Sequence, residues 1–275
     1  MLTSLGANPA LGPGPLAELA GVTAYLTAGA RTALGKNFLG AYLLGSFALG
    51  AGDEHSDVDF LIVTVDAVDT RQESALRALH AAFPDQPQHW AQHLEGSYVP
   101  AAALRRPGRP PGRWLYVDNG SPRLEFSSHD DTAVLRWVMR SSGIVLDGPA
   151  PTSLLDPVDP ADIRAESAGS LQRWARRLVD GAAGLDSAWE QQHTVLAVCR
   201  CLYSLSTGEV TSKVRSGRWA VGHLVATWVP LVERAIADRP DPWGRVHQPA
   251  DPALVGPTRA FVAHGRRIAL AADVG

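Results

Sequence analysis

The sequence holds only two cysteines in 275 residues and has no apolar run close to the ~20 residues that a membrane-spanning helix requires. Cys199 and Cys201 lie two positions apart in an apolar, helix-like stretch, where side chains at that spacing point to different sides. We therefore expect two free thiols, which fits a reducing compartment. The N-terminus lacks a basic segment followed by an apolar run, so we expect no secretory signal, no membrane contact and a cytoplasmic location.

The chain also lacks a large excess of either charge. Its 25 lysines and arginines stand against 28 acidic residues, which gives a formal net charge of −3. Proteins that bind nucleic acid broadly usually carry a basic face or a basic excess. The composition therefore favours a small-molecule substrate over broad nucleic-acid binding, and we expect a monomer or a weak homodimer.

Hydropathy patterning divides the chain into a mixed first part and a helical second part. In the first part we expect helices over residues 16–35 and 70–83, strands over residues 41–46, 57–65 and 91–100, and a hairpin that turns at Asn119-Gly120. In the second part we expect helices over residues 163–180, 187–207, 215–239 and 258–272. A Pro-rich stretch around residue 155 separates the two. The sequence thus predicts an α/β (α+β) domain with a mixed sheet over residues 1–155, followed by an all-α domain over residues 156–275.

Two aspartates at the start of an expected strand stand out in the stretch YLLGSFALGAGDEHSDVDFLIV, residues 42–63. Side chains at i and i+2 of a strand share a face, so Asp57 and Asp59 would present their carboxylates side by side. Such like charges repel unless something positive lies between them, and paired hard oxygen ligands suit Mg²⁺ together with substrate phosphates. Upstream, Gly45 permits close backbone approach and Ser46 can hydrogen-bond phosphate oxygens.

The whole pattern of Gly-Ser, about ten residues, Ser-Asp-x-Asp and then an apolar strand resembles the nucleotidyltransferase superfamily with the DNA polymerase β-like fold. The resemblance implies that Asp57 and Asp59 bind Mg²⁺ and that a neighbouring strand supplies a third carboxylate. Glu95, Asp118 and Glu125 are the candidates. We favour Glu95, because HLEGSYV reads as a short strand after a helix, whereas Asp118 lies in an expected turn and Glu125 is the fallback.

Downstream, HDDTAVLRWVMRSSGIVLDGPAP and TVLAVCRCLYSLSTGEVTSKVRSGRWA resemble the aminoglycoside (3'')(9) adenylyltransferases. Enzymes of that family join a nucleotidyltransferase domain to a helical domain and transfer AMP from ATP to streptomycin or spectinomycin. The resemblance therefore implies an antibiotic-resistance type of adenylyltransferase with ATP as co-substrate, Mg²⁺ as cofactor and an aminoglycoside-like acceptor.

The same resemblance assigns roles by position in the chain. It implies that Glu95 is the catalytic base and completes the metal site, and that Trp174 and Glu190 lie near the acceptor. Five further positions are implied to contact the nucleotide or its phosphates: Gly45, Ser46, Ser56, Asp131 and Lys213.

Structural explanations compete with several of these roles. Without the resemblance, Lys213 also reads as a solvated lysine at a helix start, and Glu190 reads equally as an acid favoured by the dipole at a helix N-terminus. Trp174 could belong to the core. Asp131 is expected inside a helix that begins at His129.

Two other functions are compatible with the motif. The first is nucleotidyl transfer to a protein or tRNA acceptor, although the acidic balance of charge weakens the tRNA version. The second is a nucleotide-binding regulator or antitoxin-like protein that has lost catalysis. Because all three candidate carboxylates are present, nothing in the sequence demands such a loss of catalysis.

Overall fold

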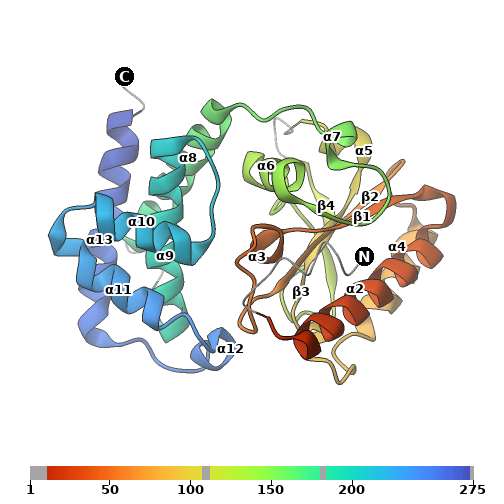
Figure 1. The fold of residues 1–275 in the computed structure, drawn as a ribbon, viewed down its shortest axis with the longest axis horizontal. Helices are drawn as coiled ribbons and strands as arrows, with labels where there is room; N and C mark the ends of the chain where they lie inside the picture. The colour runs from red at the N-terminus through yellow and green to blue at the C-terminus, as the bar shows by residue number, and fades with distance from the viewer. Residues whose placement is uncertain (1–10, 107–111, 180–183, 273–275) are drawn as a thin grey trace. The chain divides into compact units, whose positions relative to one another are not determined.

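The computed structural model describes residues 11–106, 112–179 and 184–272, and the chain divides into two compact units, Met1–Val158 and Asp159–Gly275 (Figure 1). Each unit has its own cluster of buried apolar side chains. Within the described ranges, no helix combines the length and apolar character needed to cross a bilayer.

A six-stranded mixed sheet forms the frame of the first unit, with the strand order β5-β4-β3-β2-β1-β6. Its strands are β1 (Phe38–Leu43), β2 (Val58–Thr64), β3 (Leu94–Pro100), β4 (Trp114–Val117), β5 (Leu124–Ser127) and β6 (Ile144–Asp147). The neighbours β2 and β3 are parallel and all other pairs are antiparallel. The expected mixed sheet is therefore confirmed.

Two amphipathic helices, α2 (Pro13–Leu34) and α4 (Thr70–Ala81), lie together beside the sheet (Figure 1). A capping box starts α4: the side chain of Asp69 accepts from the backbone N–H of Gln72, and the Gln72 side chain accepts from that of Asp69. The other described helical segments of this unit are η1 (Gly35–Asn37), α3 (Gly45–Ala48), η2 (His89–Gln92), α5 (Ala101–Leu104), α6 (Ala133–Ser142) and α7 (Pro151–Leu154).

Helices alone build the described part of the second unit. They are α8 (Pro160–Leu178), α9 (Ala188–Thr207), α10 (Lys213–His223), η3 (Ala226–Trp228), α11 (Val229–Ala237), α12 (Pro242–Arg245) and α13 (Pro252–Ala272). The expectation of one continuous helix over residues 215–239 is wrong. The chain leaves helical geometry at Leu224 and restarts with Pro230 in the first turn of α11, because proline fits a helix start but lacks the N–H needed in a helix interior.

Both cysteines are free, as expected. Cys199 is fully buried in the core of the second unit and Cys201 is partly buried against it. Trp174 packs against the same core, so the structural explanation for this residue has direct support.

Candidate active site

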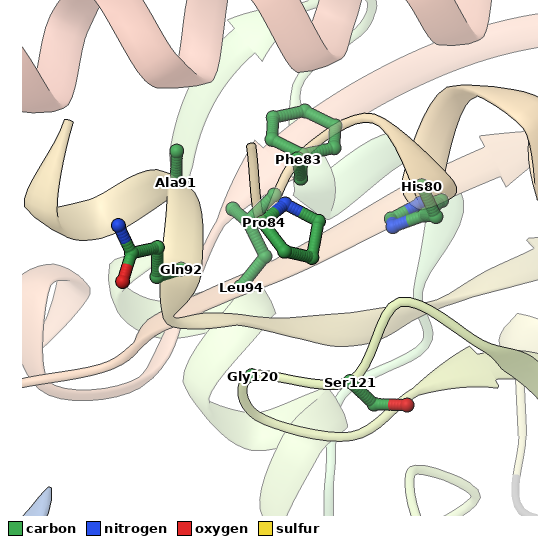
Figure 2. Close-up of a pocket in the computed structure, with 8 residues that line it drawn as sticks. All are labelled: His80, Phe83, Pro84, Ala91, Gln92, Leu94, Gly120 and Ser121. Atoms are coloured by element: carbon green, nitrogen blue, oxygen red, sulfur yellow. The ribbon is translucent and has the colours of Figure 1, made fainter. Parts of the chain in front are cut away.

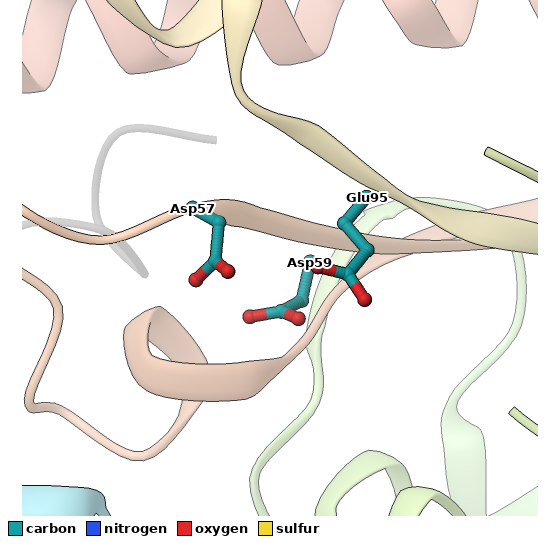
Figure 3. Close-up of side chains that lie close together, drawn as sticks. All are labelled: Asp57, Asp59 and Glu95. Atoms are coloured by element: carbon teal, nitrogen blue, oxygen red, sulfur yellow. The ribbon is translucent and has the colours of Figure 1, made fainter. Parts of the chain in front are cut away.

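The register of two parallel strands brings three carboxylates together. Asp59 on β2 is the direct neighbour of Glu95 on β3, and Asp57 precedes Asp59 by two residues on the same face. One oxygen from each of the three side chains lies within 4.8 Å of the other two. Figure 3 shows the three side chains on the same side of the strands. Three converging carboxylates are a donor set that suits a hard divalent cation.

Gly45 begins the short helix α3, which lies against β2 beside the carboxylates. Its φ is +54°, a conformation that glycine adopts easily, and a Cβ there would overlap the carboxylate of Asp59. The hydroxyl of the next residue, Ser46, is buried and has no hydrogen-bond partner among the described residues. An orphaned hydroxyl on the residue that follows Gly45 fits a site that receives a polar ligand such as a phosphate group.

Gly45→Ala is expected to reduce activity by at least about a hundredfold, because the added methyl group displaces Asp59 and a misplacement of about 1 Å can have that effect. Gly50→Ala is the matched control. Gly50 also has a positive φ, +63°, but a Cβ there meets nothing within 4 Å. Measured initial rates and melting temperatures should separate backbone strain, which both variants share, from the overlap with Asp59. Equal activity in the two variants would contradict this role for Gly45.

The environment of Glu95 makes its ionisation unfavourable. Burial, followed by the negative charge of Asp57, raises the pKa of Glu95 from its ordinary value of 4.5 to about 7. A hydrogen bond from Tyr116 and the nearby His129 oppose this rise. A carboxyl group with a pKa near neutrality is suited to accept a proton at physiological pH.

In buffer that contains a metal chelator, the contribution of Glu95 to stability should fall as the pH rises from 4.5 to 7. Below pH 4.5 Glu95 is protonated in both the folded and the unfolded chain, and above pH 7 it is ionised in both. Between these two pH values the folded chain binds more protons than the unfolded chain, so rising pH favours unfolding. A rise in pKa from 4.5 to about 7 corresponds to about 3 kcal/mol. Denaturant unfolding of wild type and Glu95→Gln across this range should show wild type losing about that much relative to the variant. A constant difference would contradict the raised pKa.

Ser56 has a structural place in the loop before β2. It is 2% exposed, its hydroxyl donates to the carboxylate of Asp53 at 3.0 Å, and its carbonyl accepts from the indole of Trp90. These bonds hold the chain that leads into Asp57. Direct contact between Ser56 and a phosphate stays a prediction.

Asp131 lies outside the helix in which it was expected. The helix α6 begins at Ala133 with Thr132 as its N-cap, because the Thr132 hydroxyl accepts from the backbone N–H of Leu135. The Asp131 carboxylate forms a buried ion pair with the guanidinium of Arg136, with side chains 2% and 1% exposed.

Further hydrogen bonds satisfy the buried groups of this ion pair. The Arg136 guanidinium also donates to the backbone carbonyls of Ala103, Leu104 and Arg106, and Asp131 accepts from the backbone N–H of Gly112. The pair thereby joins α6 to the end of α5. Contact between Asp131 and a nucleotide stays a prediction beside this structural role.

Glu190 and Lys213 both occupy the first turn of a helix. Glu190 completes a capping box with Ser187 at the start of α9, where one carboxylate oxygen accepts from the backbone N–H groups of Asp186 and Ser187. Lys213 is the first residue of α10 and is half-buried. The helix-terminal explanation therefore holds for the position of Glu190, and the acceptor and nucleotide roles of both residues stay predictions.

The two alternative third carboxylates do not belong to this group of three. Glu125 is exposed on β5, at the edge of the sheet. Asp118 follows β4, is exposed, and lies 3.0 Å from the hydroxyl of Tyr116. Among the described residues, Glu95 completes the single group of three or more potential metal ligands. Sequence analysis did not single out Tyr116, which could have been recognised only with the register of β4 against β3.

A small pocket close to the start of β3 does not contain these acids (Figure 2). It has room for about one water molecule, far too little for a nucleotide or an aminoglycoside. None of its lining residues carries a carboxylate: His80, Phe83, Pro84, Ala91, Gln92, Leu94, Gly120 and Ser121. We therefore assign the site by the three carboxylates and not by this pocket.

Comparison with known proteins gives a consistent result for both parts of the chain. Residues 31–86 match the nucleotidyltransferase domain, and residues 153–242 match the aminoglycoside adenylyltransferase C-terminal domain. Spectinomycin 9-adenylyltransferase of Staphylococcus aureus is 27% identical over 210 residues, 73% of this chain and 77% of that protein. Aminoglycoside (3'') (9) adenylyltransferase of Escherichia coli is 28% identical over 207 residues, 72% of this chain and 76% of that protein.

The fold also matches a solved structure, a spectinomycin adenyltransferase from Enterococcus faecialis determined with ATP and spectinomycin. The TM-score is 0.67 at 14% identity, and the match covers 90% of this chain and 98% of that one. The motif, the two domain matches and the fold agree. This chain is therefore similar to the aminoglycoside (3'')(9) adenylyltransferases in both of its parts, and it is an enzyme of the nucleotidyltransferase class.

Proposed function

We propose that this protein transfers AMP from ATP to a hydroxyl group of an aminoglycoside-like small molecule of the streptomycin or spectinomycin type, with Mg²⁺ as cofactor. The convergence of Asp57, Asp59 and Glu95 beside Gly45 and Ser46 is the observation that carries this proposal. The named relatives act on spectinomycin or on aminoglycosides, which supports the acceptor class.

The donor set fits a magnesium ion. Asp57 and Asp59 offer hard carboxylate oxygens on one face, and their mutual repulsion is relieved when a cation lies between them. When bound, Mg²⁺ neutralises negative charge on the triphosphate. The buried hydroxyl of Ser46 is available to donate to a phosphate oxygen, and Gly45 leaves room for the carboxylate of Asp59.

Glu95 supplies the base in this proposal. It accepts the proton of the acceptor hydroxyl, whose oxygen then bonds to the α-phosphorus of ATP while pyrophosphate leaves. The proton therefore ends on Glu95, the AMP group on the acceptor and the negative charge on pyrophosphate. In this proposal Lys213 supplies a positive charge to phosphate oxygens of ATP. Glu190 and Trp174 contact the acceptor molecule.

The direct test incubates the full chain with ATP, Mg²⁺ and a panel that contains streptomycin, spectinomycin and unrelated aminoglycosides. Mass spectrometry should detect an acceptor heavier by one adenylyl group, with release of pyrophosphate. Transfer from labelled ATP to protein or tRNA in a cell extract, with the drug panel unmodified, would reassign the acceptor. Tight ATP binding with no transfer to any acceptor would favour a regulator that has lost catalysis.

A further inference from the structure

We infer that Tyr116 is a positioning residue that holds the carboxylate of Glu95 in its reactive orientation. This inference rests on the proposed role of Glu95 as the base. Its structural basis is independent of the metal and of the acceptor, because it lies in the contacts of one tyrosine hydroxyl on the neighbouring strand.

Strand register places Tyr116 beside Glu95. In the antiparallel pair of β3 and β4, Tyr116 lies opposite Ser97, which follows Glu95 by two residues and therefore shares its face of the sheet. The Tyr116 hydroxyl donates to Oε1 of Glu95 at 2.8 Å. Because Tyr116 is only 4% exposed, its ring is held by packing and the hydroxyl has a fixed position.

The same hydroxyl lies between two carboxylates, since it is also 3.0 Å from Oδ1 of Asp118. A phenol has one proton and donates to one acceptor at a time. Asp118 is exposed and can be hydrated, whereas the side chain of Glu95 is only 19% exposed. A buried carboxylate oxygen without a hydrogen-bond donor costs more free energy than an exposed one that water can hydrate. The Tyr116 hydroxyl therefore donates its proton to Glu95.

His129 approaches the same oxygen from another direction. Its ring stacks on that of Tyr116, with centroids 5.1 Å apart and planes at 28°, and its Nε2 lies 3.4 Å from Oε1 of Glu95. Oε1 is thus engaged by two side chains, which leaves Oε2 to accept the proton of the acceptor hydroxyl. His129 is 58% exposed, so Tyr116 is the firmer of the two contacts.

Tyr116→Phe is the variant that tests the inference, because it removes the hydroxyl and keeps the ring. Loss of a hydrogen bond to a charged group predicts a decrease in kcat of about 10- to 100-fold, with the KM for ATP changed by less than about twofold. Tyr98→Phe is the matched control. Tyr98 is a buried tyrosine on β3 whose hydroxyl contacts His80 and whose side chain lies on the opposite face of the sheet. The Tyr98→Phe variant should keep most of the wild-type kcat.

A double-mutant cycle asks whether Tyr116 acts through Glu95. In a Glu95→Gln background, measured by mass spectrometry over long incubations, adding Tyr116→Phe should change the residual rate by less than about twofold. An undiminished loss in that background, or equal losses in Tyr116→Phe and Tyr98→Phe, would overturn the inference.

Crystal structures of wild type, Tyr116→Phe and Tyr98→Phe separate this inference from the proposed function. We expect the Glu95 carboxylate to keep one rotamer in wild type and in Tyr98→Phe, and to leave it in Tyr116→Phe. An unchanged Glu95 in Tyr116→Phe would refute the inference even if AMP transfer is confirmed. If wild type modifies no aminoglycoside, the proposed function fails, while the crystal structures still decide whether Tyr116 orients Glu95.

Discussion

Asp57→Asn is expected to lower AMP transfer by at least about a thousandfold while the protein stays folded. An amide in place of a carboxylate removes one of the charges that would hold Mg²⁺, and metal-based charge stabilisation is worth several kcal/mol, with each 1.36 kcal/mol equal to tenfold in rate. Transfer would be followed by pyrophosphate release and by the mass of the product.

The stability of the Asp57→Asn protein gives an independent check. In the absence of metal, the substitution removes a negative charge next to Asp59 and Glu95, so the melting temperature should stay constant or rise. Asp66→Asn is a matched control, because Asp66 is an exposed aspartate just after the other end of β2. Full activity of Asp57→Asn with Mg²⁺, or a loss of activity equal to that of Asp66→Asn, would exclude the assigned metal role.

Glu95→Gln should reduce kcat by about 10²- to 10⁴-fold, the usual contribution of a positioned general base. Glutamine keeps the size of the side chain and can still accept the hydrogen bond from Tyr116, so the fold around β3 should be preserved. Single-turnover measurements with ATP and a saturating acceptor would isolate the chemical step. The binding of ATP should change much less than the rate.

Glu125→Gln is the natural comparison for this variant. Glu125 is an exposed glutamate on the edge strand β5 of the same sheet, and it was the fallback candidate for the third carboxylate. We expect it to retain most of the wild-type rate. A large loss in Glu125→Gln together with a small one in Glu95→Gln would reverse the assignment of the base.

The parts of the site that could be predicted from the sequence are those within one strand. Asp57 and Asp59 need only the two-residue period of a strand to share a face, and the Gly-Ser pair belongs to the same local motif. The third carboxylate depends on how β2, β3 and β4 pair, which the sequence does not specify. Three acids therefore remained possible, and the register of β2 with β3 separates them.

Long-range pairing also explains the expectations that were incomplete. A sequence does not reveal that Arg136 binds three carbonyl groups near α5 and so draws Asp131 into a buried ion pair. Tyr116 was missed for the same reason, because its hydrogen bond to Glu95 depends on the pairing of β4 with β3. The break at Leu224 differs, because Pro230 was visible in the sequence and should have divided the expected helix.

The placement of Asp59 and Glu95 on adjacent strands has a consequence for heat inactivation. Their separation is set by the ladder of backbone hydrogen bonds between β2 and β3, both of which are interior strands of the sheet. Interior strands usually belong to the last cooperative segment to open. The geometry of this acid pair should therefore survive until the sheet itself melts, and not be lost earlier through the fraying of a peripheral loop.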